Sequence, residues 1–169
     1  MDFYFKELKS NSEISQFWEK KRQYEESDIF PNLPESGAEL NEIVEWFRSS
    51  EYYELIMDLH NSPIEEDSRL EFVFIYNNQQ EYIGFTTYKI YFSEDSKAFI
   101  LDFCIDKPFR NQGVGSRIVS ELKNYLKAKN ALYIALNASN EHNQRFWQNQ
   151  GFIPQYVDEN GEVIYFCVL

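Results

Sequence analysis

Cysteine and histidine are scarce in this chain of 169 residues: only Cys104, Cys167, His60 and His142 occur. Both cysteines lie in apolar stretches typical of strands, so we expect two buried thiols in a reducing cytoplasm and no disulfide framework. An isolated histidine is weak evidence for any chemistry, and we expect both histidines to face solvent on helices. We expect no metal site.

Long hydrophobic runs are also missing. No stretch approaches the roughly 20 apolar residues of a membrane-spanning helix, and the N-terminus, MDFYFKELKS, lacks the apolar segment of a signal peptide. We therefore expect a cytoplasmic protein. With 43% hydrophobic and 18% aromatic residues, the chain can bury one core, and we expect a single domain over residues 1–169.

Positive charge is in short supply. The chain has 16 basic and 28 acidic residues, which gives a net charge of −12. Such a protein repels phosphate backbones and anionic lipids, so neither nucleic acid nor a membrane is expected as a partner. A cationic small molecule is compatible with this charge, although acidity also serves solubility alone.

The stretch from Phe99 to Leu122, FILDFCIDKPFRNQGVGSRIVSEL, organises the rest of the chain. It predicts an apolar strand over 99–105, then a short turn and a glycine loop that opens a helix. Arg110, Gly113 and Gly115 form an R-x-x-G-x-G pattern in that loop. Glycines leave backbone N–H groups uncovered and the helix N-terminus is partly positive, so the loop suits a diphosphate, to which Arg110 can donate. The helix that follows has an apolar face with a 3.6-residue period: Ile118, Val119, Leu122, Tyr125 and Leu126.

Two other phosphate-binding loops do not fit this spacing. No G-K-[ST] follows the glycines, and the third glycine of a dinucleotide fingerprint is missing. Alone, the pattern is also compatible with an ordinary tight turn. A second motif, NEHNQRFWQNQGF over Asn140 to Phe152, lies downstream. With both motifs in this order, the chain resembles the Gcn5-related N-acetyltransferase (GNAT) superfamily, whose members use acetyl-CoA.

The predicted element order agrees with this resemblance. A strand over 2–8 precedes helical segments, in which we expect Ser12 to cap the first helix and Ser36 with Glu39 to form a capping box. Whether Ser49-Ser50 interrupts one helix or joins two is left open. Strands are then expected over 70–76, 81–92, 99–105, 132–136, 152–157 and 162–168, with helices after Gly115 and Asn140. The resemblance implies an α/β (α+β) fold: a mixed, mostly antiparallel sheet flanked by helices, with splayed central strands.

The resemblance also implies where acetyl-CoA binds. Pantetheine is expected between the splayed strands 99–105 and 132–136, and the diphosphate at the glycine loop. Asn140 is expected to contact the cofactor, although it can equally serve only as the N-cap of its helix. The implied cofactor-binding residues are Phe103, Cys104, Ile105, Arg110, Asn111, Gln112, Gly113, Val114, Gly115, Ser116 and Asn140.

The usual acid and base of the family are replaced here. Many members have a tyrosine acid where this chain has Trp147, and some have a glutamate base where it has Ala135. Asp102 is the nearest carboxylate in the strand and is our candidate catalytic base. Strand alternation opposes this role, because Leu101, Phe103 and Ile105 point to the opposite face, and a structural role for Asp102 stays open. We expect Cys104 to be a buried thiol and not a nucleophile.

The resemblance implies that the helical region over 35–60 forms the acceptor lip. Trp46, Tyr52 or Tyr53 could stack on a substrate there, and its glutamates could attract a cation. An acidic face that merely meets water is the alternative. The glutamates concerned are Glu35, Glu39, Glu42, Glu45, Glu51 and Glu54.

Together these features predict an acetyl-CoA-dependent N-acetyltransferase. We expect direct transfer to the primary amine of a small, cationic acceptor, without a covalent intermediate or a metal. The alternatives are acetylation of a protein N-terminus or lysine, and a catalytically silent acyl-CoA-binding module. The sequence leaves the oligomeric state open between a monomer and a homodimer.

Overall fold

The computed structural model describes residues 2–64 and 66–169. In them, one seven-stranded sheet has the order β1-β2-β3-β4-β5-β7-β6. Neighbouring strands are antiparallel except β4 and β5, which are parallel. The expected mixed, mostly antiparallel sheet is therefore confirmed. Its strands are β1 (Phe3–Glu7), β2 (Glu71–Asn77), β3 (Tyr82–Tyr91), β4 (Lys97–Ile105), β5 (Tyr133–Asn137), β6 (Ile153–Val157) and β7 (Val163–Val168).

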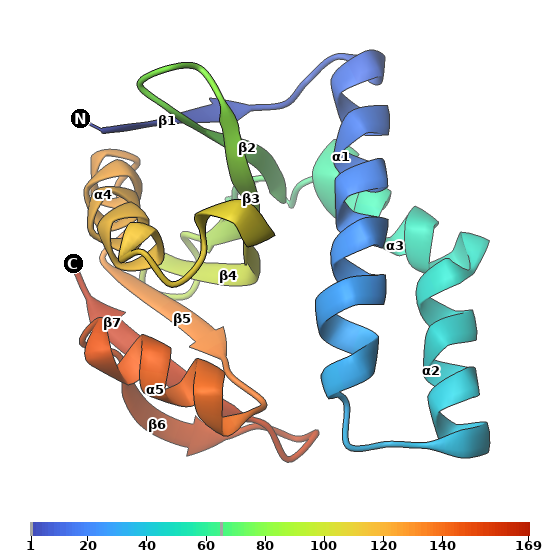
Figure 1. Ribbon diagram of the computed structural model, residues 1–169. Coiled ribbons are helices and arrows are strands. Elements are labelled where there is room, and N and C mark those ends of the chain that lie inside the picture. Colours follow the sequence, from blue (N-terminus) through green and yellow to red (C-terminus); the bar gives the residue numbers. More distant parts are fainter. Residues whose placement is uncertain (1, 65) are drawn as a thin grey trace.

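Helices cover the sheet from two sides (Figure 1). One side carries α1 (Asn11–Tyr24), α2 (Gly37–Arg48) and α3 (Ser50–Asn61), and the other carries α4 (Val114–Ala128) and α5 (Glu141–Asn149). A π-helical turn, η1 (Glu25–Ile29), extends α1 and is followed by the 3-10 turn η2 (Phe30–Asn32). A second 3-10 turn, η3 (Lys107–Phe109), joins β4 to the glycine loop.

The two sides of the sheet bury separate apolar clusters. On the α4 side, Ile118 and Leu122 pack with Phe103 and Ile105, while on the α1 side Cys104 joins a cluster around Phe17 and Phe72. The apolar face expected for α4 is confirmed, with Tyr125 only partly buried. Because Cys104 and its neighbours in β4 serve opposite clusters, this strand forms the centre of the molecule.

A β-bulge interrupts β4 at Leu101. Asp102 pairs with Thr87 of β3 and Ile100 pairs with Tyr88, so Leu101 is an extra residue without a partner in β3. Consequently Ile100 packs on the same side as Phe103, and Leu101 is 45% exposed. We had expected Leu101 to share the face of Phe103 by simple alternation. That expectation was wrong, because the bulge changes the parity of the strand.

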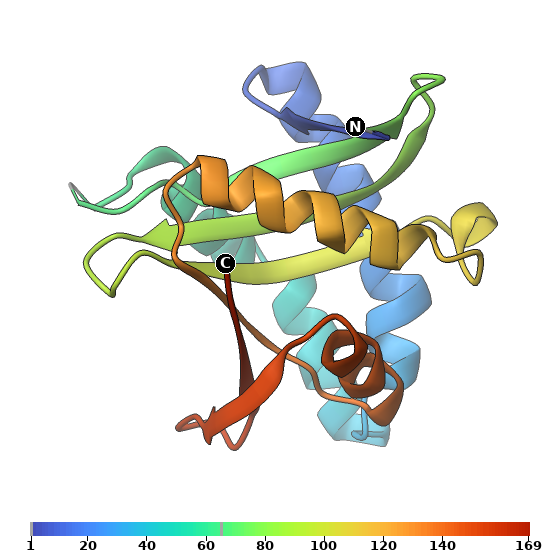
Figure 2. The same cartoon turned by 90° about the vertical axis from the view of Figure 1, so that its left-hand side faces the viewer.

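The splay between β4 and β5 begins next to this bulge. The two strands pair only where Lys97–Phe99 faces Tyr133–Ala135. Beyond Phe99 they diverge, and β5 runs away from β4 beneath α4 (Figure 2). The expected splayed central strands are confirmed.

Helix boundaries show where local signals were misread. Ser10, and not Ser12, caps α1, and it forms a capping box with Glu13. Ser36 does precede α2, but its side chain makes no capping hydrogen bond, so the predicted box with Glu39 was wrong. Ser49 separates α2 from α3, since its hydroxyl accepts a hydrogen bond from the N–H of Tyr52 at 3.1 Å.

One histidine differs from expectation. His60 is 3% exposed, stacks on Phe72 with ring centroids 4.3 Å apart, and lies with Nδ1 2.7 Å from the Leu70 carbonyl. Burial lowers the pKa of its imidazole. His142 is exposed, and both cysteines are buried, as expected. Among the described residues, no helix has the length and hydropathy that crossing a membrane requires.

Candidate functional site

The C-terminal half of β4 presents a free edge, which is the first component of the site. Asp106 donates its N–H to the carbonyl of Ile83 at 2.8 Å. Because antiparallel pairs alternate, Cys104 turns its backbone groups to Phe85 in β3, and Phe103 and Ile105 turn theirs outward. The divergence of β5 leaves this outward edge without a neighbouring strand. An extended ligand with amide groups can pair with it as an added strand.

The glycine loop is the second component. Within residues 2–64 and 66–169, no protein group accepts a hydrogen bond from the backbone N–H groups of residues 111–116. Asn111 and Gly113 adopt positive φ angles of 59° and 74°, which bends the loop into the N-terminus of α4. A Cβ at Gly115 would lie 3.3 Å from the ring of Phe146, so α5 packs closely here. These uncovered donors at a helix N-terminus favour an anion.

Arg110 does not extend toward these donors. Its guanidinium donates to both carboxylate oxygens of Asp28 in η1, at 3.0 and 2.7 Å, and its Nε donates to the Ile105 carbonyl at 2.6 Å. The hydrogen bond to Asp28 raises the pKa of Arg110. The side chain thus spans the free edge of β4 and ties it to the end of α1. Its predicted contact with a diphosphate stays a prediction.

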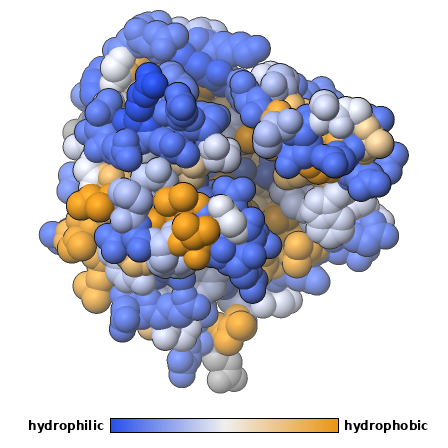
Figure 3. Space-filling model, turned by 90° about the horizontal axis from the view of Figure 1, so that it is seen from below, coloured by the Kyte–Doolittle hydropathy of each residue, from blue (hydrophilic) through white to orange (hydrophobic). Residues whose placement is uncertain are grey.

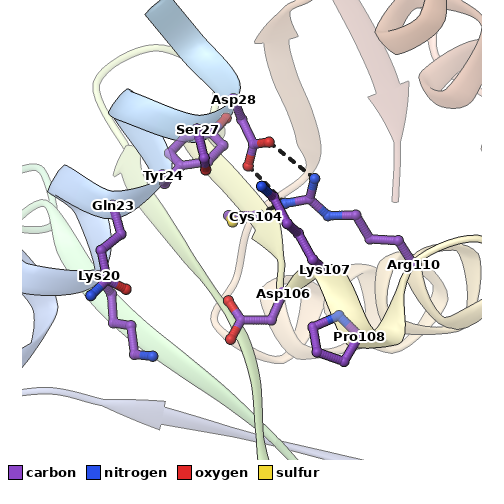
Figure 4. Close-up of a pocket in the computed structure, with 10 residues that line it drawn as sticks. All are labelled: Lys20, Gln23, Tyr24, Ser27, Asp28, Cys104, Asp106, Lys107, Pro108 and Arg110. Carbon is purple, nitrogen blue, oxygen red and sulfur yellow. Dashed lines mark hydrogen bonds and ion pairs between the residues drawn. The ribbon is translucent and has the colours of Figure 1, made fainter.

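This ion pair forms part of the wall of a pocket of about 210 Å³, whose lining residues are drawn in Figure 4. Tyr24 and Asp28 line it from α1 and η1, and Cys104 and Arg110 line it from β4 and the loop. Burial raises the pKa of the Cys104 thiol to about 12, which keeps it protonated at neutral pH. This agrees with a structural thiol.

Asp102, the candidate base, belongs to a buried ionic cluster on the α1 side. Both its oxygens lie 3.3 Å from Nζ of Lys21, and it accepts a hydrogen bond from Thr87 Oγ1 at 2.7 Å. Lys21 also pairs with Glu25, 3.5 Å away. Burial opposes the charge of Lys21, but Asp102, Tyr52 and Glu25 outweigh it and raise the pKa of the ammonium. Burial raises the pKa of Glu25, and the nearby positive charge of Lys21 only partly offsets this rise.

The two positions at which the resemblance implies catalytic groups hold apolar side chains. Trp147 is 7% exposed and packs against Phe103 and Phe152, with ring centroids 5.2 and 5.0 Å away. Ala135 is fully buried in β5. Neither side chain can donate or accept a proton usefully. Asn140 caps α5, since its side-chain oxygen accepts from the N–H of Asn143 at 2.8 Å.

The expected acceptor region is open on its outer face. Trp46 and Tyr53 are 46% and 39% exposed, whereas Tyr52 is buried against the Lys21 cluster and is not free to stack on a ligand. Of the six glutamates expected here, Glu35 is half-buried and the other five are exposed: Glu39, Glu42, Glu45, Glu51 and Glu54. Seen from below, the molecule is hollowed between the side that carries α5 and β6 and the side that carries α1 and α2 (Figure 3).

Sequence reasoning missed Lys21, Glu25 and Asp28. The first two are four residues apart, a spacing that indicates an ion pair on a helix, but it does not indicate burial. Asp28 carries no sequence signal, because its partner is 82 residues away. Among the described residues, no group of three or more His, Cys, Asp or Glu side chains is placed to hold a metal ion.

Comparison with known proteins gives one family and one fold. A family model described as Acetyltransferase (GNAT) family matches residues 38–152, more than half of the chain. No curated protein matches. Among solved structures, PaiA N-acetyltransferase from Thermoplasma acidophilum in complex with coenzyme A is 15% identical over 100% of both chains, with a TM-score of 0.65.

Two further structures are similar over most of their length. The catalytic domain of Tetrahymena GCN5 histone acetyltransferase in complex with coenzyme A is 16% identical, over 99% of this chain and 92% of that one, with a TM-score of 0.60. Spermidine/spermine N-acetyltransferase SpeG from Vibrio cholerae is 14% identical, over 99% and 92%, with a TM-score of 0.61. At these identities the likeness shows a shared fold.

Proposed function

The chain belongs to the acetyltransferase (GNAT) family, and we propose that it transfers an acetyl group from acetyl-CoA to the primary amine of a small, cationic acceptor. The free edge of β4 beside the uncovered N–H groups of the glycine loop is the observation that carries the proposal. Two of the similar structures are complexes with coenzyme A, which supports the same cosubstrate here.

The residues of the site fit such a cosubstrate. Phe103 and Ile105 offer outward backbone groups to the amides of pantetheine, and the N–H groups of residues 111–116 are available to a diphosphate. Cys104 has its backbone directed to β3, so we assign it a place in the pocket wall and no backbone contact. Asn140 uses its oxygen as a cap, and we propose that its amide nitrogen contacts the cofactor. When bound, acetyl-CoA supplies the activated acyl carbonyl.

Proton transfer has to proceed without the usual tyrosine and glutamate. We keep Asp102 as the candidate base, although Lys21 and Thr87 already engage its oxygens and an amine would have to displace one of them. Asp102→Asn tests this role through the pH dependence of kcat/KM. Loss of the limb that reports deprotonation would support a base, whereas an unaltered profile would mean that another group or water takes the proton.

Charge supports a cationic acceptor. The net charge is −12, and the exposed glutamates of α2 and α3 border the expected acceptor region. A spermidine/spermine N-acetyltransferase is among the similar structures. We expect kcat/KM to fall as ionic strength rises, because the Debye length shrinks from about 30 Å at 0.01 M salt to about 3 Å at 1 M. Replacing Glu51 and Glu54 by Gln should raise KM and flatten this dependence.

Release of the CoA thiol from acetyl-CoA tests the function. The amines are spermidine, an aminoglycoside, a basic peptide and glutamate, each at low and high salt. We expect the cationic small amines to react fastest. Preference for the basic peptide would support acetylation of protein amines. Binding of CoA without turnover of any amine would instead identify a silent acyl-CoA-binding module, which the apolar Trp147 and Ala135 make a specific alternative.

A further inference from the structure

Arg110 pairs with a carboxylate of the protein itself, although its motif predicts a contact with a diphosphate. It is the first residue of R-x-x-G-x-G, yet its guanidinium forms a two-pronged ion pair with Asp28 and its Nε bonds the Ile105 carbonyl (Figure 4). The planar fork of arginine matches a carboxylate in this geometry. Three segments, the end of α1, the end of β4 and the glycine loop, are therefore joined by one side chain.

This side chain occupies the edge that an added strand would use. The Ile105 carbonyl points outward from β4, where β5 has already diverged, and Arg110 approaches it from that outward side. An extended ligand that pairs with this edge competes with Arg110 for the carbonyl and for the space beside it. The contact therefore obstructs the same surface that the site offers to pantetheine.

The ion pair between Arg110 and Asp28 is partly exposed to water, which allows it to exchange partners. The side chains of Arg110 and Asp28 are 34% and 19% exposed, so water partly screens their attraction. A diphosphate presents more negative charge than one carboxylate and can replace Asp28 as the partner of the guanidinium. Asp28 also lies in a π-helical turn, a local irregularity often found at functional sites.

We propose that Arg110 and Asp28 form a latch across the free edge of β4, and that the diphosphate of the cofactor opens it by drawing Arg110 away from Asp28. The latch rests on the proposed function, because it needs a ligand that carries pantetheine and a diphosphate together. It makes the diphosphate a condition for access to the edge. Pantetheine alone, which has no diphosphate, must break the latch without compensation, so the latch selects coenzyme A thioesters over shorter thioesters.

Calorimetric titration with CoA and with pantetheine tests the latch in three variants. Asp28→Asn removes the charge that holds Arg110, so both ligands should bind more tightly by up to about fivefold, the upper end of the range for a partly exposed ion pair. Arg110→Gln removes both the obstruction and the diphosphate contact. Pantetheine should then bind more tightly, while the preference for CoA over pantetheine should fall at least about tenfold. Glu26→Gln is the matched control, since Glu26 lies in the same turn but pairs with the exposed Arg48.

A second measurement follows the latch directly. The Nε–H proton of Arg110, identified by its loss in Arg110→Gln, should be protected from solvent exchange in the free protein, and CoA should change its NMR signal. Thermal melts confirm that each variant is folded.

The outcomes separate the latch from the proposed function. CoA binding with unchanged pantetheine affinity in both Asp28→Asn and Arg110→Gln would overturn the latch and leave the function standing. An Arg110 signal that does not respond to saturating CoA would do the same. Failure of the wild type and of all three variants to bind CoA would overturn the proposed function and the latch with it.

Discussion

Replacing Gly115 by valine probes the tightest packing at the glycine loop. A Cβ at this position would lie 3.3 and 3.4 Å from two ring carbons of Phe146, and valine adds two further methyl groups. Phe146 has little freedom to retreat, because it stacks on Phe103 and packs edge-on against Trp147, with centroids 6.1 and 5.0 Å away. The backbone of the loop must therefore move.

The expected effect on binding follows from that movement. Hydrogen bonds from backbone N–H groups weaken steeply once the donor leaves the range of about 2.7–3.2 Å. Loss of even one charge-assisted bond to the diphosphate costs about 1.4 kcal/mol or more, which is a tenfold rise in the Kd for CoA. Gly115→Ala, which needs Phe146 to shift by only a few tenths of an ångström, should cost less.

Calorimetry with CoA measures the effect, and a thermal melt checks the fold. Overpacking at Phe146 should destabilise Gly115→Val by about 1–3 kcal/mol. Ser120→Val is the control, because it places the same side chain at an exposed position of α4. A folded Gly115→Val protein with wild-type affinity for CoA would refute the assignment of the diphosphate to this loop.

Three further predictions concern the buried groups. Trp147→Phe should keep most of the turnover, since Trp147 packs and donates no proton; a kcat loss of several orders of magnitude with intact CoA binding would contradict this. Lys21→Met should lower the free energy of unfolding, measured by urea titration, by about 3–5 kcal/mol, because it leaves the carboxylates of Asp102 and Glu25 buried without their cation. Lys20→Met, at the neighbouring position of α1, is the control and should not have this effect. Burial lowers the pKa of His60, so the unfolded chain binds a proton that the fold resists, and stability should fall as pH drops below about 6.5. The Tm of His60→Phe should fall less than that of the wild type between pH 7 and 5.5, and parallel curves would contradict the assignment.

Local patterns in the sequence were sufficient to predict most helices and strands and the glycine loop. The 3.6-residue period of α4, the glycines between β4 and α4 and the asparagine before α5 each act within a few residues. Gly151, with φ of +90°, ends α5 as expected, because a left-handed residue there suits glycine. Such features depend on backbone preferences that neighbouring residues already fix.

The ion-pair partners of the buried charged side chains could not be predicted from the sequence. Arg110 meets Asp28 across 82 positions, and Lys21 meets Asp102 across 81. A charged residue on a helix usually faces solvent, so the pattern of α1 and η1 gave no reason to bury Lys21 and Glu25. His60 was also misplaced, since its burial depends on stacking against Phe72 in β2, the strand that follows α3.

The sequence by itself determined a glycine loop between a strand and a helix, and thereby the prediction that this loop holds a diphosphate. Tertiary structure alone decided which backbone groups are free beside it. The bulge at Leu101 shifts the parity of β4, and β5 leaves β4 beyond Phe99 to pair with β7. Both features arise from hydrogen bonds that β4 and β5 share with other strands, and neither is encoded in the residues of β4 alone.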